Sequence, residues 1–436
     1  MSDLFNGVLA RGPVAGAVDG AAWLRAMLEA EAALAEAGAE VGLVPAKAAA
    51  RIVDACRTIQ LDVPTLSRDA AAAGNPVVPL VGVLERAAGA EAGPYVHRGA
   101  TSQDVMDTAM VLVARRALDL LLADLRSCAD AAAVLAAEHR DTVLAGRTLL
   151  QQALPTTFGL KAAGWLVALD GATARLAAVR DRLPAQLGGA VGTLSAAGPD
   201  ALALLDAYAG RLDLAVPVVP WHTLRLPVAD LAGALGTATG VVGKVALDVT
   251  LLAQTEVGEV AEGTPGRGGS STMPHKRNPV AAVSARAAAR RAPGLVATLL
   301  SAMDQEHERA AGAWHAEWQP LSDLASTAGS AAAWLADCLS ALEVDTERMR
   351  ANLDRSGAAL AAEAVAAALT GTLGRSAAHD LVAAATRDPR DLRTVLLEQQ
   401  DVLSDHDLDA LLDTTRHLGQ AGALVDRALA GREDGR

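Results

Sequence analysis

From Gln103 to Arg140 the 436-residue chain contains no glycine or proline. Within this stretch, apolar residues recur at helical spacing, at Met106, Met110, Val113, Ala117 and Leu121. One uninterrupted helix over this stretch would be roughly 50 Å long, at about 1.5 Å per residue. Because a single globular core rarely needs so long a helix, whereas a bundle does, the stretch predicts a bundle of long helices.

Composition agrees with this prediction. Of the residues, 51% are hydrophobic and only 2% are aromatic, so alanine, leucine and valine must fill the interior. Alanine and leucine are strong helix formers, which favours an all-α protein. Further long helices are predicted over 155–182, 228–262, 294–312 and 322–352, and no strand-type alternation of any length is found.

The pattern predicts three domains. Residues 1–102 read as a small N-terminal domain of short helices, 103–352 as the central long-helix bundle, and 353–436 as a smaller helical C-terminal domain. In the first, Asp19 can cap a helix whose apolar face also contains Glu31. In the bundle, Gly233, Gly236, Gly240 and Gly243 stand at three- and four-residue spacing, which favours close helix packing over a phosphate loop, because no strand precedes them.

The net charge of -13 argues against a nucleic-acid partner, which would need a basic surface. The longest charge-free stretch, 183–199, is interrupted by glycine, serine and proline and is a poor membrane span. The N-terminus lacks the apolar core of a signal peptide. The three cysteines lack metal-ligand spacing and suggest reduced thiols. We expect a soluble, cytoplasmic protein without a membrane partner.

The segment GRGGSSTMPHKRNPV (266–280) has an unusual composition. Its glycines allow backbone angles closed to other residues and could serve as hinges of a lid. A solvated linker is the alternative, but linkers do not usually contain Met-Pro-His-Lys-Arg-Asn-Pro.

This segment resembles the signature loop of the fumarase/aspartase superfamily, Gly-Ser-Ser-x-Met-Pro-x-Lys-x-Asn-Pro, and matches every fixed position of it. The resemblance implies that Ser270 is the base that exchanges a proton with the carbon beside a carboxylate. It also implies that Lys276 and Asn278 bind and polarise that carboxylate. Such chemistry develops a doubly charged aci-carboxylate, so fixed positive charge and hydrogen-bond donors are needed where that charge appears.

A second cluster is YVHRGATSQDVMDTA (95–109). Thr101 or Ser102 can cap the long helix, and their hydroxyls would then lie beside the free N–H groups of its first turn, as an anion site. An ordinary cap without a ligand is the alternative. The string resembles the superfamily's carboxylate-binding Thr-Ser-x-Asp segment, with His97 where adenylosuccinate lyases have a catalytic or substrate-binding histidine.

A third segment, 145–165, resembles the part of the family that supplies the general acid. Most of those lyases read Gly-Arg-Thr-His, but this chain has Leu149 in place of the histidine. In fumarase-type members that histidine pairs with a glutamate, and this chain has Val283 there. The loss of both members resembles the bacterial 3-carboxy-cis,cis-muconate cycloisomerases, whose leaving group is a carboxylate and leaves without a proton.

The resemblance therefore implies a homotetrameric lactonising enzyme of protocatechuate (β-ketoadipate) catabolism, with sites shared between subunits, a small polycarboxylate substrate, and no metal or organic cofactor. The catalytic residues would be Ser270 and Lys276. The substrate-binding residues would be His97, Arg98, Thr101, Ser102, Thr148, Gln151, Met273, His275, Asn278 and Arg309. Two alternatives stay open: a β-elimination lyase on a succinyl-type adduct (adenylosuccinate, argininosuccinate or a nitrosuccinate-like acid), and a non-catalytic structural protein on the same scaffold.

Overall fold

A computed structural model describes residues 3–269, 273, 276–355, 362–388, 390, 392–398 and 405–434. The chain divides into two compact units. Unit 1 consists of 1–126, 171–244 and 284–335, and unit 2 consists of 127–170, 245–283 and 336–436. The division into domains 1–102, 103–352 and 353–436 stays a prediction.

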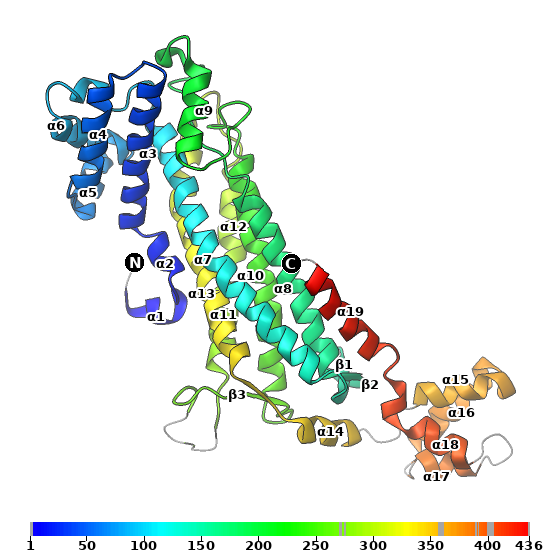
Figure 1. Cartoon of the computed structure of the whole chain (residues 1–436). Coiled ribbons are helices and arrows are strands. Elements are labelled where there is room, and N and C mark those ends of the chain that lie inside the picture. Colours follow the sequence, from blue (N-terminus) through cyan, green and yellow to red (C-terminus); the bar gives the residue numbers. More distant parts are fainter. Residues whose placement is uncertain are drawn as a thin grey trace. The chain divides into compact units, whose positions relative to one another are not determined.

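Short helices make up much of unit 1. They are α1 (Asn6–Leu9), α2 (Val14–Ala17), α3 (Gly20–Glu40), α4 (Ala46–Thr58), α5 (Val63–Ala73), α6 (Val77–Ala88) and α9 (Ala201–Arg211). Asp19 caps α3 as predicted, because its carboxylate accepts the N–H of Ala22 at 2.7 Å. Helix α3 packs beside α4 and α9 (Figure 1).

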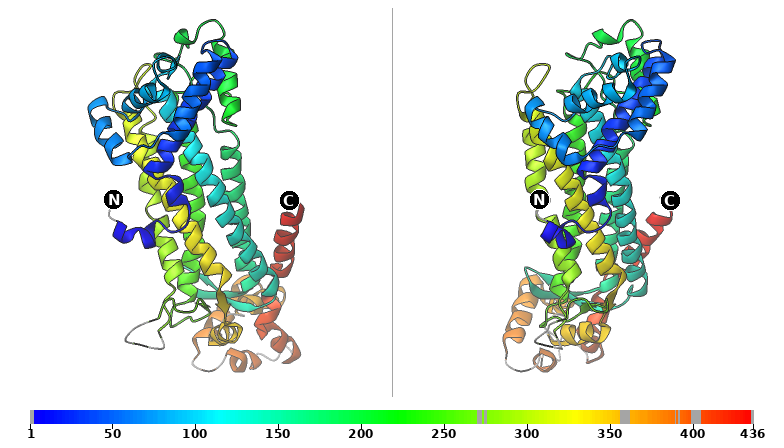
Figure 2. Two further views of the ribbon diagram at one scale, coloured as in Figure 1. Left: turned by 60° about the vertical axis from the view of Figure 1, so that its left-hand side comes forward. Right: turned by 90° about the vertical axis from the view of Figure 1, so that its left-hand side faces the viewer.

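The long helices are α7 (Ser102–Glu138), α8 (Phe158–Arg180), α10 (Leu226–Leu252) and α13 (Ala313–Ser340). The predicted apolar face of α7, from Met106 to Leu121, is buried at every one of its positions. In unit 1, segments of α7, α10 and α13 run side by side (Figure 2) and, with α3, enclose a cavity of only about 10 Å³. The helices are therefore close-packed around this cavity.

Helix α10 shows why the bundle tolerates such an alanine- and glycine-rich sequence. A Cβ on Gly236 would come within 2.9 Å of Val296 in α12 (Ala292–Ser301), and one on Gly243 within 3.1 Å of Ala289 in α11 (Val280–Ala289). The packing interpretation is confirmed at these two glycines. At Gly233 and Gly240 a Cβ would meet nothing within 4 Å.

By length and composition alone, α8 and α10 are apolar enough to cross a membrane. In α10, however, Leu235, Val242 and Val249 are buried within the protein. Buried helices of a bundle have the same composition.

Three helix predictions were wrong in their limits. The helix predicted over 294–312 ends at Ser301, and α13 then begins at Ala313 and continues through Pro320. A proline inside a helix removes one N–H and crowds the preceding turn, so it usually ends or kinks the helix. Burial of Trp314, Leu321 and Leu324 on both sides of the proline offsets that loss.

Strands occur in unit 2, although none was predicted. The antiparallel strands β1 (Val143–Thr148) and β2 (Gln151–Thr157) form a hairpin, and β3 (Val260–Glu262) pairs with β4 (Leu342–Val344). Strands β3 and β4 occupy residues that were predicted to be the C-terminal ends of helices over 228–262 and 322–352. The observed helices end earlier, at Leu252 and Ser340.

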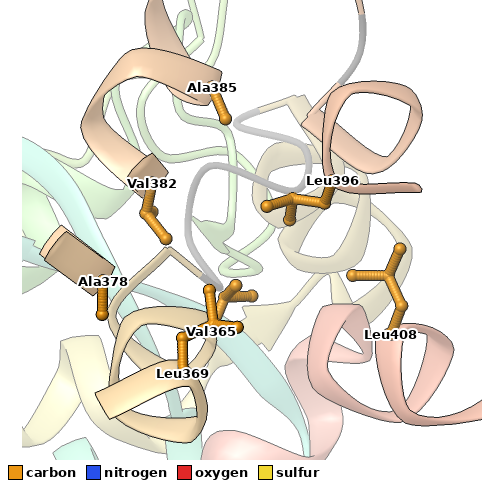
Figure 3. Packing of buried hydrophobic residues seen from close by; sticks show 7 residues of the cluster. All are labelled: Val365, Leu369, Ala378, Val382, Ala385, Leu396 and Leu408. Atoms are coloured by element: carbon orange, nitrogen blue, oxygen red, sulfur yellow. The ribbon is translucent and has the colours of Figure 1, made fainter. Parts of the chain in front are cut away.

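The C-terminal part of unit 2 contains α14 (Thr346–Arg355), α15 (Ala362–Leu373), α16 (Arg375–Arg387), α17 (Leu392–Leu397), α18 (Asp405–Leu412) and α19 (Ala421–Asp434). Helices α15 to α18 share a small core of their own. Figure 3 shows its buried side chains, which are Val365, Leu369, Ala378, Val382, Ala385, Leu396 and Leu408.

Candidate active site

The predicted site residues belong to two groups, each within one unit. Unit 1 contains His97, Arg98, Thr101, Ser102 and Arg309, and unit 2 contains Thr148, Gln151, Met273, Lys276 and Asn278. Ser270 and His275 lie outside the described residues.

The first turn of α7 is held by Asp104. Its carboxylate accepts the N–H of Thr101 at 3.0 Å and the N–H groups of Gly188 and Gly189 at 3.1 and 2.9 Å. Burial raises the pKa of Asp104, and the hydrogen bonds from Gln186, Thr101 and Gly189 oppose that shift. Its bond to Thr101 is the acidic half of a capping box, in which a side chain of the first turn accepts the N–H of the residue before the helix.

The hydroxyls of Thr101 and Ser102 are half-buried and have no hydrogen-bond partner among the described residues. Arg98, three residues earlier than Thr101, is exposed and forms no ion pair with any residue that the structure describes. These groups are therefore free to contact a ligand at the start of α7.

Arg309 is already engaged within unit 1. Its guanidinium donates to the carbonyl of Ala190 at 3.1 Å, to the carbonyl of Gly189, and to Oε1 of Gln103 at 2.7 Å. Gln103 also donates to the carbonyl of His222 at 2.7 Å. Arg309 therefore holds the 189–190 loop against the first turn of α7, and its predicted contact with substrate stays a prediction.

The partner of His97 was missed by the sequence analysis. Nδ1 of His97 lies 2.6 Å from Oε1 of Glu31, and the Glu31 side chain is fully buried in α3. Burial disfavours the protonated imidazole, but the Glu31 carboxylate, followed by Asp104 and Glu85, outweighs it and raises the pKa of His97. The available signal was an acidic residue on the apolar face of a predicted helix.

His222 lies next to Gly192. It is buried, and its Nδ1 has no hydrogen-bond partner in the part of the chain that the structure describes. Gly192 has φ +82°, and a Cβ there would come within 2.5 Å of the imidazole. Burial, followed by the positive charge of Arg309, lowers the pKa of His222.

A buried ion cluster supports this region. Arg225, which is fully buried, pairs with Asp107 at 2.7 Å and with Glu317 at 2.5 Å. Trp314 donates its indole N–H to Asp107 at 3.0 Å. Because Asp107 also accepts from Gln103 at 3.1 Å, the cluster fixes the same helical turn that Arg309 contacts.

In unit 2, the two ends of the signature loop are joined. Gly269 and Arg277 form an antiparallel bridge, and the carbonyl of Gly268 accepts both the backbone and the side-chain N–H of Asn278, at 2.9 and 3.0 Å. Gly266 and Gly268 have φ +75° and +77°. Two of the three predicted hinge glycines are thus in left-handed conformations, whereas Gly269 is not.

The cations of this loop differ in their contacts. Arg277 pairs with Glu343 of β4 at 3.0 Å, whereas Lys276 is exposed and forms no ion pair with a described residue. Glu262 accepts the N–H groups of Ala281 and Ala282 at 3.0 and 2.8 Å. These contacts fix the end of the loop and leave the Lys276 ammonium available.

The third predicted segment forms the tip of the β1–β2 hairpin. Thr148 pairs with Gln151 across a two-residue turn, Leu149–Leu150, whose φ values are +49° and +66°. Both leucines are exposed, at 97% and 77%. Positive φ at both positions is typical of a type I′ turn, for which Asn-Gly is the usual sequence.

Arg147 anchors this hairpin. Its guanidinium donates to both carboxylate oxygens of Glu259, at 2.9 and 2.6 Å, and Asn352 donates to the same carboxylate at 2.9 Å. Glu259 immediately precedes β3, and the signature loop follows that strand. No cluster of histidine, cysteine or acidic residues suited to a metal ion occurs among the described residues.

Comparison with known proteins identifies the class. Residues 16–294 match the family described as "Lyase", and residues 359–428 match "Adenylosuccinate lyase C-terminus". The chain therefore belongs to the lyase family of the fumarase/aspartase superfamily, has its long-helix fold, and is an enzyme of the lyase and cycloisomerase class.

Two kinds of relative stand out. The chain is 48% identical to the nitrosuccinate lyase of Streptomyces davaonensis, covering 99% of this chain and 95% of the relative. It is 49% identical to the 3-carboxy-cis,cis-muconate cycloisomerase of Pseudomonas aeruginosa, covering 98% and 96%. The crystal structure of the 3-carboxy-cis,cis-muconate lactonizing enzyme of Pseudomonas putida superposes with a TM-score of 0.92 at 43% identity, covering 99% of each chain.

Proposed function

We propose that this enzyme is a 3-carboxy-cis,cis-muconate cycloisomerase of protocatechuate catabolism. It adds a carboxylate oxygen to one carbon of a double bond and a proton to the next, which gives a carboxymuconolactone. Ser270 exchanges the proton with carbon. Lys276, Asn278, Thr101 and Ser102 hold the carboxylates, and the remaining predicted residues line the pocket.

The observation that carries this proposal is the pair of apolar residues at 149 and 283. Both side chains are exposed, at 97% for Leu149 and 50% for Val283, and neither can donate a proton. An amine leaving group needs such a donor, whereas a carboxylate, with a pKa near ~4, leaves unaided at neutral pH. The reaction that fits is one whose leaving or attacking group is a carboxylate.

A nitrosuccinate lyase is the second candidate, because the Streptomyces davaonensis relative is 48% identical over nearly the whole chain. Nitrite is also the anion of a moderately strong acid and leaves without a proton. Ser270 would remove the proton beside the carboxylate in the nitrosuccinate reaction, and would deliver a proton to that carbon during lactonisation. The missing acid therefore argues against adenylosuccinate and argininosuccinate but not against nitrosuccinate.

Two assays on one preparation separate the candidates. Loss of the diene ultraviolet absorbance of 3-carboxy-cis,cis-muconate reports cycloisomerase activity, and release of nitrite and fumarate reports the lyase. We expect kcat/KM to be higher for the muconate, and Ser270→Ala to abolish turnover while Ser301→Ala, on the exposed end of α12, has no effect. Faster nitrite release would select the lyase, and inactivity on both substrates would favour a silent scaffold.

We further propose a cytoplasmic homotetramer whose subunits share sites. The exposed leucines at the hairpin tip and the exposed Val218 and Leu224 support this proposal, since apolar surface of this kind is usually covered. Sedimentation at assay concentration tests the assembly. Mixing subunits of Ser270→Ala with subunits of Thr148→Ala tests the sharing, because hybrid tetramers regain activity only if the two residues serve one site from different chains.

A further inference from the structure

The closest ionisable contact at the start of α7 is the pair of Glu31 and His97. Glu31 lies in the middle of α3, its side chain is fully buried, and its second oxygen has no hydrogen-bond partner among the described residues. A buried carboxylate with an unmatched oxygen is costly unless a positive charge stands beside it. The imidazole of His97, 2.6 Å away, is the group in position to supply that charge.

The other groups around this pair favour the same charge state. Asp104 of α7 and Glu85 of α6 act on His97 with the same sign as Glu31. Cys56 of α4 and Tyr208 of α9, which are close to Glu31, stay neutral, because burial raises the pKa of the thiol to about 12 and raises that of the phenol. The acidic residues that act on the imidazole therefore come from three helices, α3, α6 and α7.

The contact also orients the ring. Because Nδ1 is bound to Glu31, Nε2 is the nitrogen left for a ligand. His97 has a left-handed backbone, with φ +58°, and lies four residues before Thr101, at the turn that leads into α7. A protonated ring held in this way keeps its second N–H as a donor, on a residue that precedes Thr101 and Ser102 by one turn of chain.

We propose that Glu31 is a positioning residue that keeps His97 as an imidazolium, with its Nε2–H available to a substrate carboxylate at the first turn of α7. The inference rests on the proposed polycarboxylate substrate. In this proposal Glu31, which is distant in sequence, maintains the His97 imidazolium as a cation for an anionic substrate, in a chain whose net charge is -13.

Binding of tricarballylate, a stable tricarboxylate, tests the proposal without turnover. By calorimetry in two buffers of different ionisation enthalpy, the wild-type enzyme should bind near neutral pH without proton uptake. Glu31→Gln should bind about tenfold more weakly there, take up a proton on binding, and recover affinity at lower pH. Glu31→Asp should restore part of the wild-type behaviour.

The matched control is Glu29→Gln, on the same helix, where the carboxylate pairs with Arg116 at the surface. It should leave affinity and proton uptake unchanged. A purely structural role for Glu31 predicts a loss that is the same at every pH, and that result would overturn the proposal.

A second measurement does not depend on any ligand. Titration of the His97 imidazole by NMR in histidine-labelled enzyme should show a protonated ring at neutral pH in the wild type. In Glu31→Gln the ring should give up this proton at a lower pH than it does in the wild type. A neutral ring in the wild type refutes the proposal. Failure of tricarballylate to bind would instead count against the polycarboxylate substrate, and the NMR result would still decide the role of Glu31.

Discussion

Arg147 and Glu259 form a two-point ion pair in which the carboxylate has no exposed surface and the guanidinium is 22% exposed. The pair joins the β1–β2 hairpin to the residue that precedes β3. Both of its ends lie in unit 2 and lead directly into segments that carry predicted site residues.

Replacing Arg147 with methionine should reduce the free energy of unfolding by roughly 3–5 kcal/mol, because it leaves the Glu259 charge buried without a partner. Urea titration monitored by circular dichroism measures the loss. The control is Arg350→Met, whose pair with Asp354 is exposed and one helical turn apart, and which should cost no more than about 0.5 kcal/mol. Equal effects of the two substitutions would contradict the anchoring role.

Gly268→Ala should impair catalysis more than Gly266→Ala. Both glycines have positive φ, so alanine costs roughly 1 kcal/mol at either position. At Gly268 alone the new Cβ would collide with the carbonyl of Asn278, whereas at Gly266 it meets open space. Displacement of Asn278 should lower kcat about a hundredfold, as measured in the productive assay. Matching activities would mean that the junction of the loop ends does not position the site.

The turn sequence Leu149–Leu150 lowers the stability of the protein, which suggests that these two leucines are kept for function. Each left-handed leucine costs about 1–2 kcal/mol, which Leu149→Asn combined with Leu150→Gly should recover as greater resistance to urea. If these leucines line a shared pocket, the same double variant should raise KM. Leu202→Asn, at an exposed leucine of α9, should change neither quantity. A double variant that is less stable than the wild type would refute the strain argument.

His222 should make the protein sensitive to acid. Its pKa is lowered in the folded state, so below the ordinary histidine value of about 6.5 the unfolded chain binds a proton that the folded chain does not. Its contribution to stability is thus present above that pH and is lost as the pH falls. The stability difference between wild type and His222→Asn should shrink between about pH 7.5 and 5.5. His379→Gln, at an exposed histidine of α16, should show no such trend.

The bundle was predictable because its signal is local. The apolar face of α7 repeats within one segment, and the cap at Asp19 is three residues from the amide it binds. The β1–β2 hairpin was not predictable, because its turn is Leu-Leu instead of Asn-Gly and its strands contain Gly146 and Pro155. Continuation of α13 through Pro320 depends on burial that no local pattern reveals.

The site also contains residues that were predictable from local sequence and residues that were not. The signature loop and the Thr-Ser segment are contiguous strings and were found by resemblance. Glu31 and Glu259 contact residues 66 and 112 positions away, so the neighbouring sequence does not identify their partners, although Glu31 stood out as an acidic residue on an apolar helix face. Arg309 was predicted as a substrate contact, and the structure shows its donors directed at loop carbonyls and Gln103.

The close approach of α10 to its neighbours limits how this sequence can diverge. A methyl group on Gly236 would require Val296 to move, and one on Gly243 would crowd Ala289. Among relatives, a larger residue at either glycine should therefore be accompanied by a smaller one opposite it. Gly233 and Gly240, which face open space, should vary independently.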